Sequence, residues 1–244
     1  MKLTIIGHWG GYPAKNEASS GYLIQNKGFN LLIDCGSGVL SALQNILLPE
    51  ELDAVVISHY HPDHVADIGV LQHALLIGKH SGKHNKTLPI YGHMESANGF
   101  RSLSYKDITK GHAYFEQQPF NIGPFTINTL RTNHPVPCFA MRIQTGQQSL
   151  VFTADSAFQD SFVSFSESTD LLLCEANFFK GMNGKAAGHM TSEEAGVLAQ
   201  KANVKKLVLT HLPHFGNISQ LQLEAEQYFS GPVVLARQNL TLTI

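Results

Sequence analysis

The chain has 244 residues, of which 43% are hydrophobic and 15% charged, and its formal net charge is -2. That length and composition predict one large domain or two small ones with a full apolar core. A near-neutral charge without a long basic run disfavours electrostatic binding of long polyanions, so we expect long RNA not to be a partner. No run approaches the roughly 18 apolar residues that a membrane span needs, so no membrane partner is expected.

The N-terminal apolar run is interrupted at Gly7 and His8, which leaves it too short for the core of a signal peptide. The three cysteines are far apart and form no CxxC pair, which argues against a disulfide framework and a zinc knuckle. We therefore expect a soluble cytoplasmic protein. Histidine, with 13 copies, is the residue type whose positions need explaining.

Short apolar runs alternate with amphipathic segments in the first half of the chain. The pattern predicts a hairpin turn at 26–28 and helices at 38–47, 65–78 and 94–104. Strands are predicted at 2–7, 21–25, 29–36, 53–58 and 88–93.

The second half predicts a run of strands, followed by alternating strands and helices. Strands are expected at 112–118, 124–132, 138–145, 149–154, 170–176, 205–212 and 231–237, and helices at 191–202 and 219–229. No linker divides the chain, so we expect one domain over residues 1–244. Mixed strands and helices throughout indicate layered sheets with helices outside.

Polar side chains gather where four of the apolar strands end. His59, Asp155, Glu175 and His211 each follow such a strand. Ligand sites of α/β proteins commonly lie beyond the carboxyl ends of strands. The four strand ends therefore predict a shared site.

The sharpest motif is HYHPDH, residues 59–64. His59 and His61 are two residues apart, so an extended chain points both to one side. Pro62 ends the strand, and Asp63 and His64 fall at the start of the next helix. Three imidazoles and a carboxylate crowded into six residues, with Asp63 and His64 adjacent, do not suit one tetrahedral ion, and the spacing favours two.

Three later residues supply the remaining ligands of such a pair. We predict one ion held by His59, His61, His134 and Asp155, and a second held by Asp63, His64, Asp155 and His211. Asp155 would bridge both ions. Two divalent ions about 3.5–4 Å apart would activate a shared hydroxide.

The other histidines have less specific settings. His80, His84, His93 and His112 read as solvated surface residues. His214 lines the site or stands in a surface turn, and His8 and Trp9 contact substrate or pack within their own loop. The sequence leaves these alternatives open.

A well-defined helix start follows the segment AAGHM, residues 186–190. Thr191 and Glu194 form a capping box, which fixes the first turn of the helix at 191–202. His189 precedes this box and has no part in it.

With these residues in view, the chain resembles the metallo-β-lactamase-fold superfamily. The resemblance rests on HYHPDH with the later His134, Asp155 and His211, in the order that this superfamily uses. It implies an αββα sandwich, in which two mixed sheets face each other and helices cover the outer faces. It also implies two divalent metal ions, usually zinc and in some branches manganese or iron.

Two further motifs, CEANF (174–178) and GHMTSEEA (188–195), resemble the ribonuclease Z-like phosphodiesterase branch. In that branch a strand-end Glu orients a His that assists the leaving group, and Glu175 and His189 match these positions. The resemblance implies a metal-dependent hydrolase in which Asp63 orients the attacking water, and it implies a homodimer by analogy.

The chain departs from ribonuclease Z in one respect. The tRNA-processing enzymes carry a long arm between the ligands that correspond to His134 and Asp155, and here only 20 residues separate them. We therefore expect a small phosphodiester or a cyclic nucleotide as substrate. The alternatives are a thioester or lactone hydrolase of the same fold and a tRNA 3′-processing endonuclease.

Overall fold

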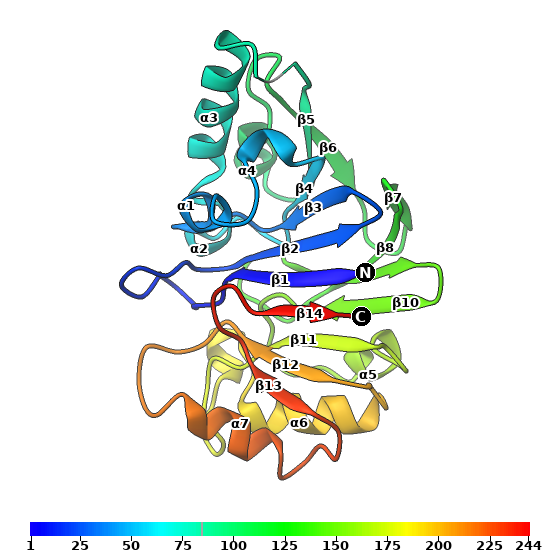
Figure 1. Ribbon diagram of the computed structural model, residues 1–244. Coiled ribbons are helices and arrows are strands. Elements are labelled where there is room, and N and C mark those ends of the chain that lie inside the picture. Colours follow the sequence, from blue (N-terminus) through cyan, green and yellow to red (C-terminus); the bar gives the residue numbers. More distant parts are fainter. Residues whose placement is uncertain (84) are drawn as a thin grey trace. The chain divides into compact units, whose positions relative to one another are not determined.

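The computed structural model describes residues 1–83 and 85–244, so His84 and its predicted surface position lie outside the described residues. The chain divides into two compact units (Figure 1). Unit 1 comprises Met1–Phe115, Ile122–Pro124 and Gln238–Thr243, and unit 2 comprises Glu116–Asn121, Phe125–Arg237 and Ile244. The single domain over residues 1–244 stays a prediction.

Unit 1 is built on a seven-stranded mixed sheet in the order β14-β1-β2-β3-β4-β5-β6. Strands β14 to β3 pair antiparallel, and β3 to β6 pair parallel. The strands are β1 (Lys2–Gly7), β2 (Gly21–Asn26), β3 (Phe29–Ile33), β4 (Ala54–Val56), β5 (Leu88–His93), β6 (Thr109–Tyr114) and β14 (Thr241–Thr243). Its helices are α1 (Val39–Leu43), η1 (Pro49–Glu51), α2 (Pro62–Val65), α3 (Ile68–His80) and α4 (Ala97–Ser102).

The core of unit 1 lies between one face of this sheet and helices α1 and α3. Ile68, Leu71 and Leu75 recur at helical spacing on α3 and are buried. They join α1 and strand side chains in one apolar cluster, which includes Leu23, Leu32, Val55 and Ile90. Burial of this face is what holds α3 against the sheet.

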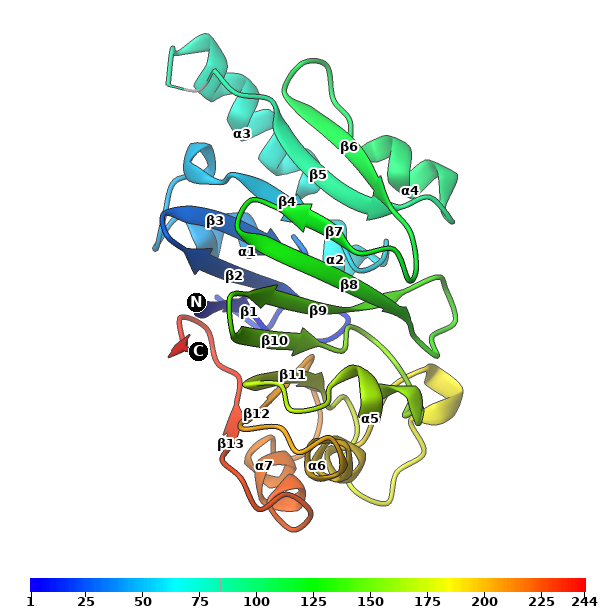
Figure 2. The ribbon, with the colours of Figure 1, turned by 90° about the vertical axis from the view of Figure 1, so that its right-hand side faces the viewer.

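Unit 2 is built on a second seven-stranded sheet in the order β13-β12-β11-β10-β9-β8-β7. Strands β10 to β13 pair parallel, and β8, β9 and β10 pair antiparallel. The strands are β7 (Phe120–Ile122), β8 (Phe125–Arg131), β9 (Phe139–Thr145), β10 (Gln148–Phe152), β11 (Leu171–Glu175), β12 (Leu207–Thr210) and β13 (Val233–Leu235). Its helices are α5 (Ser161–Phe165), η2 (Lys185–Ala187), α6 (Ser192–Lys201) and α7 (Ser219–Ala225), and Figure 2 shows α6 and α7 beside β11, β12 and β13.

Most predicted elements are present, with shifted ends that have local causes. The strand predicted at 29–36 stops at Ile33 because Asp34 adopts a left-handed backbone, with φ 55°. The helix predicted at 65–78 begins at Ile68, since the short helix α2 precedes it. The strand predicted at 112–118 instead spans Thr109–Tyr114, because Leu88 to His93 of β5 pair with that stretch.

Candidate metal centre

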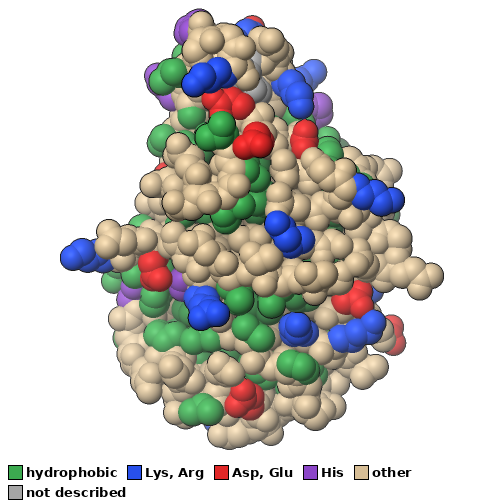
Figure 3. Space-filling model, in the orientation of Figure 1, with side chains coloured by type: hydrophobic (Ala, Val, Ile, Leu, Met, Phe, Trp, Pro, Cys, Tyr) green, Lys and Arg blue, Asp and Glu red, His purple; other side chains and the backbone are tan. Residues whose placement is uncertain are grey.

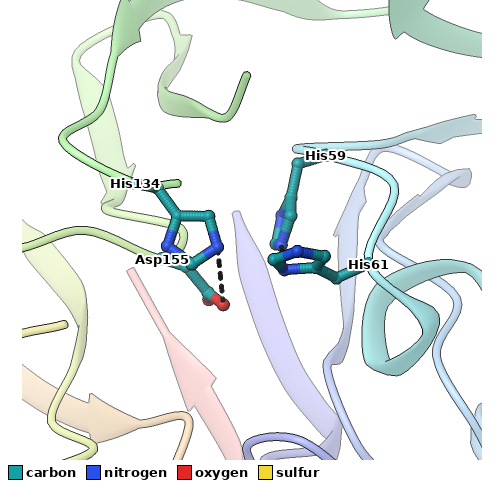
Figure 4. Close-up of side chains that lie close together, drawn as sticks. All are labelled: His59, His61, His134 and Asp155. Atoms are coloured by element: carbon teal, nitrogen blue, oxygen red, sulfur yellow. Dashed lines mark hydrogen bonds and ion pairs between the residues drawn. The ribbon is translucent and has the colours of Figure 1, made fainter. Parts of the chain in front are cut away.

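The motif at 59–64 has the local geometry that its sequence predicts. His61 has an extended backbone and is the N-cap of α2, and Pro62 is the first residue of that helix. The Nε2 atom of His59 lies 3.1 Å from the Nδ1 atom of His61. The two rings meet edge to face with centroids 4.8 Å apart (Figure 4).

This pair of nitrogens fits a shared divalent ion. Tetrahedral coordination with metal–nitrogen bonds of 2.0–2.1 Å places two ligand nitrogens about 3.3–3.4 Å apart. The separation between His59 and His61 is close to that value. The donor set of unit 1 is therefore suited to zinc or a similar cation.

Asp63 and His64 form the second part of the motif, within α2. Both are buried, and Asp63 Oδ2 lies 3.5 Å from His64 Nε2. The backbone N–H of Gly11 donates to the same oxygen of Asp63 at 2.7 Å. The first loop of the chain therefore fixes the orientation of this carboxylate.

Asp34 is a residue of this site that our sequence reasoning missed. Its carboxylate is fully buried and lies 2.7 Å from His64 Nδ1. It also accepts hydrogen bonds from the backbone N–H and the hydroxyl of Ser58, which in turn lies 3.1 Å from His59 Nδ1. A carboxylate on one ring nitrogen leaves the other nitrogen for a metal. The signal that could have found Asp34 is its place at the end of an apolar strand, before Cys35 and Gly36.

The candidate ligands of unit 2 converge on one oxygen of Asp155. Its Oδ2 atom lies 3.2 Å from His211 Nε2 and 4.0 Å from His134 Nε2. Figure 4 shows the ring of His134 and the carboxylate of Asp155 turned toward each other. One oxygen that faces two imidazoles has the arrangement that a bridging ligand requires.

Backbone strain marks the same positions. Ala154, which directly precedes Asp155, and His211 itself have positive φ angles of 51° and 53°. Such conformations cost on the order of 1–3 kcal/mol for residues other than glycine, and they persist where the surrounding structure enforces them. Asp34 has the same conformation, so three of the ten described non-glycine residues with positive φ lie at or directly beside candidate site residues.

Glu175 and His189 form a hydrogen-bonded pair in unit 2. Glu175 ends β11 and is fully buried, and its Oε1 atom lies 2.8 Å from His189 Nδ1. The backbone N–H groups of Ser156 and Asn177 also donate to this carboxylate. The His189 ring stacks on the His211 ring, with centroids 5.2 Å apart. The pair thus lies beside His211, a candidate metal ligand.

The capping box before α6 is present as predicted. Thr191 accepts from the backbone N–H of Glu194, and the Glu194 carboxylate accepts from the backbone N–H of Thr191. It fixes the start of α6 at Ser192, three residues after His189.

Gly188 connects the His189 loop to His134. Its carbonyl oxygen lies 3.0 Å from His134 Nδ1, which directs the Nε2 atom of that ring toward Asp155. Gly188 has φ 75°, and a Cβ atom there would stand 2.5 Å from Pro135 and 2.9 Å from His134. Only glycine suits both the backbone and the space.

Gly188→Ala is expected to lower the free energy of unfolding by about 3 kcal/mol, from the left-handed backbone and the overlap with His134 and Pro135. Gly181→Ala is the matched control, because Gly181 has φ 80° but open space around it. We expect this control to cost about 1 kcal/mol. Urea unfolding of both variants measures the difference, and equal losses would contradict a close contact at Gly188.

His8 and Trp9, in the first loop of the chain, pack against or bond to residues near them in sequence. His8 is buried, and the indole N–H of Trp9 donates to Glu17. Burial lowers the pKa of His8 from 6.5 to about 4, with Glu17 acting in the opposite direction. This is the packed alternative of the two that the sequence left open.

A pH dependence of stability follows from His8. The unfolded chain binds a proton at His8 near pH 6.5, whereas the folded chain binds it only near pH 4. The free energy of unfolding is therefore highest, as far as His8 is concerned, above pH 6.5, and it decreases as the pH falls toward 4. The total decrease is about 3 kcal/mol. Chemical unfolding at pH 4 to 7 should show a smaller slope for His8→Leu than for the unaltered chain, and identical slopes would contradict the assignment.

Among the three described histidines that were predicted as surface residues, His93 departs from the prediction and His112 departs from it in part. His93 is buried rather than solvated, because β5 ends against Tyr60, whose hydroxyl donates to the His93 carbonyl. His80 is exposed as predicted, and His112 is half-buried and stacks on Tyr91. His214 is half-buried.

Comparison with known proteins decides the family. A family model described as a β-lactamase superfamily domain matches residues 29–212. The probable metallo-hydrolase YhfI of Bacillus subtilis (strain 168) is 54% identical over 237 residues, which cover 97% of this chain and 97% of that protein. The chain belongs to the β-lactamase superfamily.

The similarity extends to a solved structure. The crystal structure of the metallo-β-lactamase-fold protein YhfI from Bacillus subtilis aligns with a TM-score of 0.98 at 52% identity, over 99% of this chain and 98% of that one. This match confirms the predicted metallo-β-lactamase fold, an α/β sandwich. A protein named ribonuclease Z, from Clostridium novyi (strain NT), is 26% identical over 284 residues, covering 86% of this chain and 88% of that protein.

This member of the β-lactamase superfamily is therefore a metallo-hydrolase related to ribonuclease Z. Divalent metal binding follows from the family, and the described residues include groups of His, Asp and Glu side chains that could hold an ion. Among the helices of the described residues, none has both the length and the hydropathy to cross a bilayer.

Proposed function

We propose that this metallo-hydrolase is a phosphodiesterase that acts on a small phosphodiester or a cyclic nucleotide. The observation that carries the proposal is the hydrogen bond between Glu175 and His189 beside His211. The metal ligands that we propose are His59, His61, Asp63, His64, His134, Asp155 and His211, with Asp155 shared by two ions.

The fit of the donor atoms supports two divalent ions, with zinc as the first choice and manganese or iron as alternatives. Bound in this way, such ions supply Lewis acidity that stabilises the charge on the phosphoryl oxygens. In unit 1, Asp34 and Ser58 hold the imidazoles of His64 and His59 in place. In unit 2, the Gly188 carbonyl does the same for His134.

His189 is the proposed general acid. Glu175 contacts its Nδ1 atom, which fixes the tautomer and leaves Nε2 to face the substrate. A protonated His189 stabilised by Glu175 donates to the leaving oxygen, where negative charge develops. Glu175 acts only through His189, so it is a positioning residue.

Asp63 is the proposed proton acceptor. The Gly11 N–H holds its carboxylate in a fixed orientation. A carboxylate held in this way orients the attacking water and accepts its proton. Asp63 thus has a catalytic role in addition to its proposed role as a ligand.

The connection between His134 and Asp155 supports a small substrate. Strands β9 and β10 fill it as a hairpin, with the turn at Gly146, so the long arm of the tRNA-processing enzymes has no counterpart there. On the face shown in Figure 3, lysine and arginine side chains are scattered and alternate with acidic ones. Long nucleic acids need a continuous basic surface.

One panel of substrates tests the proposal. The metal-loaded protein is assayed with bis-p-nitrophenyl phosphate, cyclic nucleotides, a short pre-tRNA and a lactone. We expect turnover of the phosphodiesters and not of the lactone. Turnover of the lactone alone would support the thioester or lactone hydrolase, and pre-tRNA as the preferred substrate would support the 3′-processing endonuclease. We also propose a homodimer, which light scattering tests.

A further inference from the structure

We propose that Phe178 and Phe215 form a stacking surface that binds the aromatic base of a nucleotide substrate, on the side of the leaving group. This inference rests on the proposed phosphodiesterase function, because His189 serves the leaving oxygen. It names two specificity-determining residues and restricts the substrate to phosphodiesters that carry a planar aromatic group.

The backbone of unit 2 holds Phe178 beside His189. The N–H of Phe178 donates to the Met190 carbonyl, and the Ser192 N–H donates to the Phe178 carbonyl. The Phe178 ring lies 6.2 Å from the His189 ring, centroid to centroid. Gly184 lies against both, since a Cβ atom there would stand 2.8 Å from the Phe178 ring and 2.6 Å from the His189 carbonyl. Phe178 is therefore a fixed neighbour of the proposed acid.

Phe215 completes the surface from the loop that follows His211. Its ring is 45% exposed and lies 6.3 Å from the Phe178 ring at an angle of 62°. Phe179 contacts it from a second side, at 5.8 Å. Gly216, which follows Phe215, has a left-handed backbone with φ 73° and lies against the Phe179 ring. The loop thus holds an exposed aromatic ring on an aromatic support.

The arrangement suits a base better than an aliphatic chain. A base stacked on the exposed Phe215 ring would meet the Phe178 ring at a steep angle, since these two rings lie at 62° to each other. Stacked and edge-to-face contacts are the two geometries that aromatic rings prefer. Aromatic stacking on a base is effective for all four bases, because each has a π-face. Exposure of the large apolar Phe215 ring to water is also unfavourable in free energy, and a bound base would cover that ring.

Binding without turnover is the first test. The dissociation constants of adenosine 5′-monophosphate and of inorganic phosphate are measured by calorimetry on the metal-loaded protein, for the unaltered chain, Phe178→Leu and Phe215→Leu. We expect each variant to weaken binding of the nucleotide about 10-fold and to leave that of phosphate unchanged. Phe120→Leu, in β7, is the matched control and should change neither.

Kinetics supply the second test. With a nucleoside phosphodiester, Phe178→Leu and Phe215→Leu should each raise KM about 10-fold with little change in kcat. The reason is that stacking on the base is equally strong in the ground and transition states. With an alkyl diester that lacks a ring, Phe215→Leu should change KM far less than it does with the nucleoside phosphodiester. Equal losses on both substrates, or a nucleotide that binds no better than phosphate, would overturn the stacking surface.

The two proposals fail in different ways. If the protein turns over no phosphodiester but binds the nucleotide tightly and through Phe215, the proposed phosphodiesterase function is wrong and the stacking surface stands. Turnover of alkyl and nucleoside diesters with equal efficiency would retain the phosphodiesterase and remove the stacking surface. Stronger binding of an acylated phosphate than of the nucleotide would identify an aliphatic ligand and would also contradict the stacking surface.

Discussion

His189→Ala is expected to lower kcat by about 10²–10⁴-fold on a phosphodiester with an alkoxide leaving group. The leaving oxygen then departs without a proton donor, while Glu175 keeps its bonds to Ser156 and Asn177. On a p-nitrophenyl ester the loss should be much smaller, because p-nitrophenolate is a stable anion. Steady-state kinetics on the two substrates measure the ratio.

Metal content and a histidine control separate a chemical role from a structural one. His80→Ala removes an exposed histidine at the end of α3 and should leave kcat unchanged. The metal content of His189→Ala should equal that of the unaltered chain. Loss of an ion from His189→Ala would instead identify the cluster of Glu175, His189 and His211 as a metal site, and equal losses on both leaving groups would contradict the general acid.

Asp155→Asn is the second large effect that we expect. The substitution keeps the size of the side chain but removes the charge from the oxygen that faces both His134 and His211. We expect the content of divalent metal to fall and kcat to drop on the order of 10³-fold or more, since bound metals supply several kcal/mol of transition-state stabilisation. Elemental analysis and kinetics at controlled free zinc measure both.

A surface carboxylate provides the control for this substitution. Asp107→Asn removes an exposed partner of Lys79 and should change neither the metal content nor kcat. If Asp155→Asn keeps its full metal content and loses activity, Asp155 is not a bridging ligand and acts on the substrate instead. If it keeps both, the proposed ligand set is wrong at this position.

Local patterns predicted much of the candidate site. The spacing of HYHPDH fixes an extended pair of histidines followed by a helix start, because Pro62 both ends the extended stretch and begins α2. The capping box at Thr191 and Glu194 is equally local. Short strands such as β7 and β14 were missed, since three residues carry little periodicity and form only by pairing with a neighbour.

Distant contacts were not predictable from the same patterns. Asp34 bonds a histidine 30 positions later in the chain, and the Gly188 carbonyl meets His134 across 54 positions. His93 reads as a surface residue from its neighbours, but the end of β5 buries it. Pairings of this kind depend on strand order and loop path, which a local pattern does not encode.

The sequence by itself determined the residue types, their order along the chain and the local turns that present them, because spacing, proline and capping act within a few residues. Only the tertiary structure decided that one oxygen of Asp155 faces His134 and His211, and that Glu175 meets His189. The parallel pairing of β10, β11 and β12 brings these strand ends together. Beyond the ends of β10 and β12, Ala154 and His211 adopt left-handed backbone, a strain that the surrounding tertiary structure enforces.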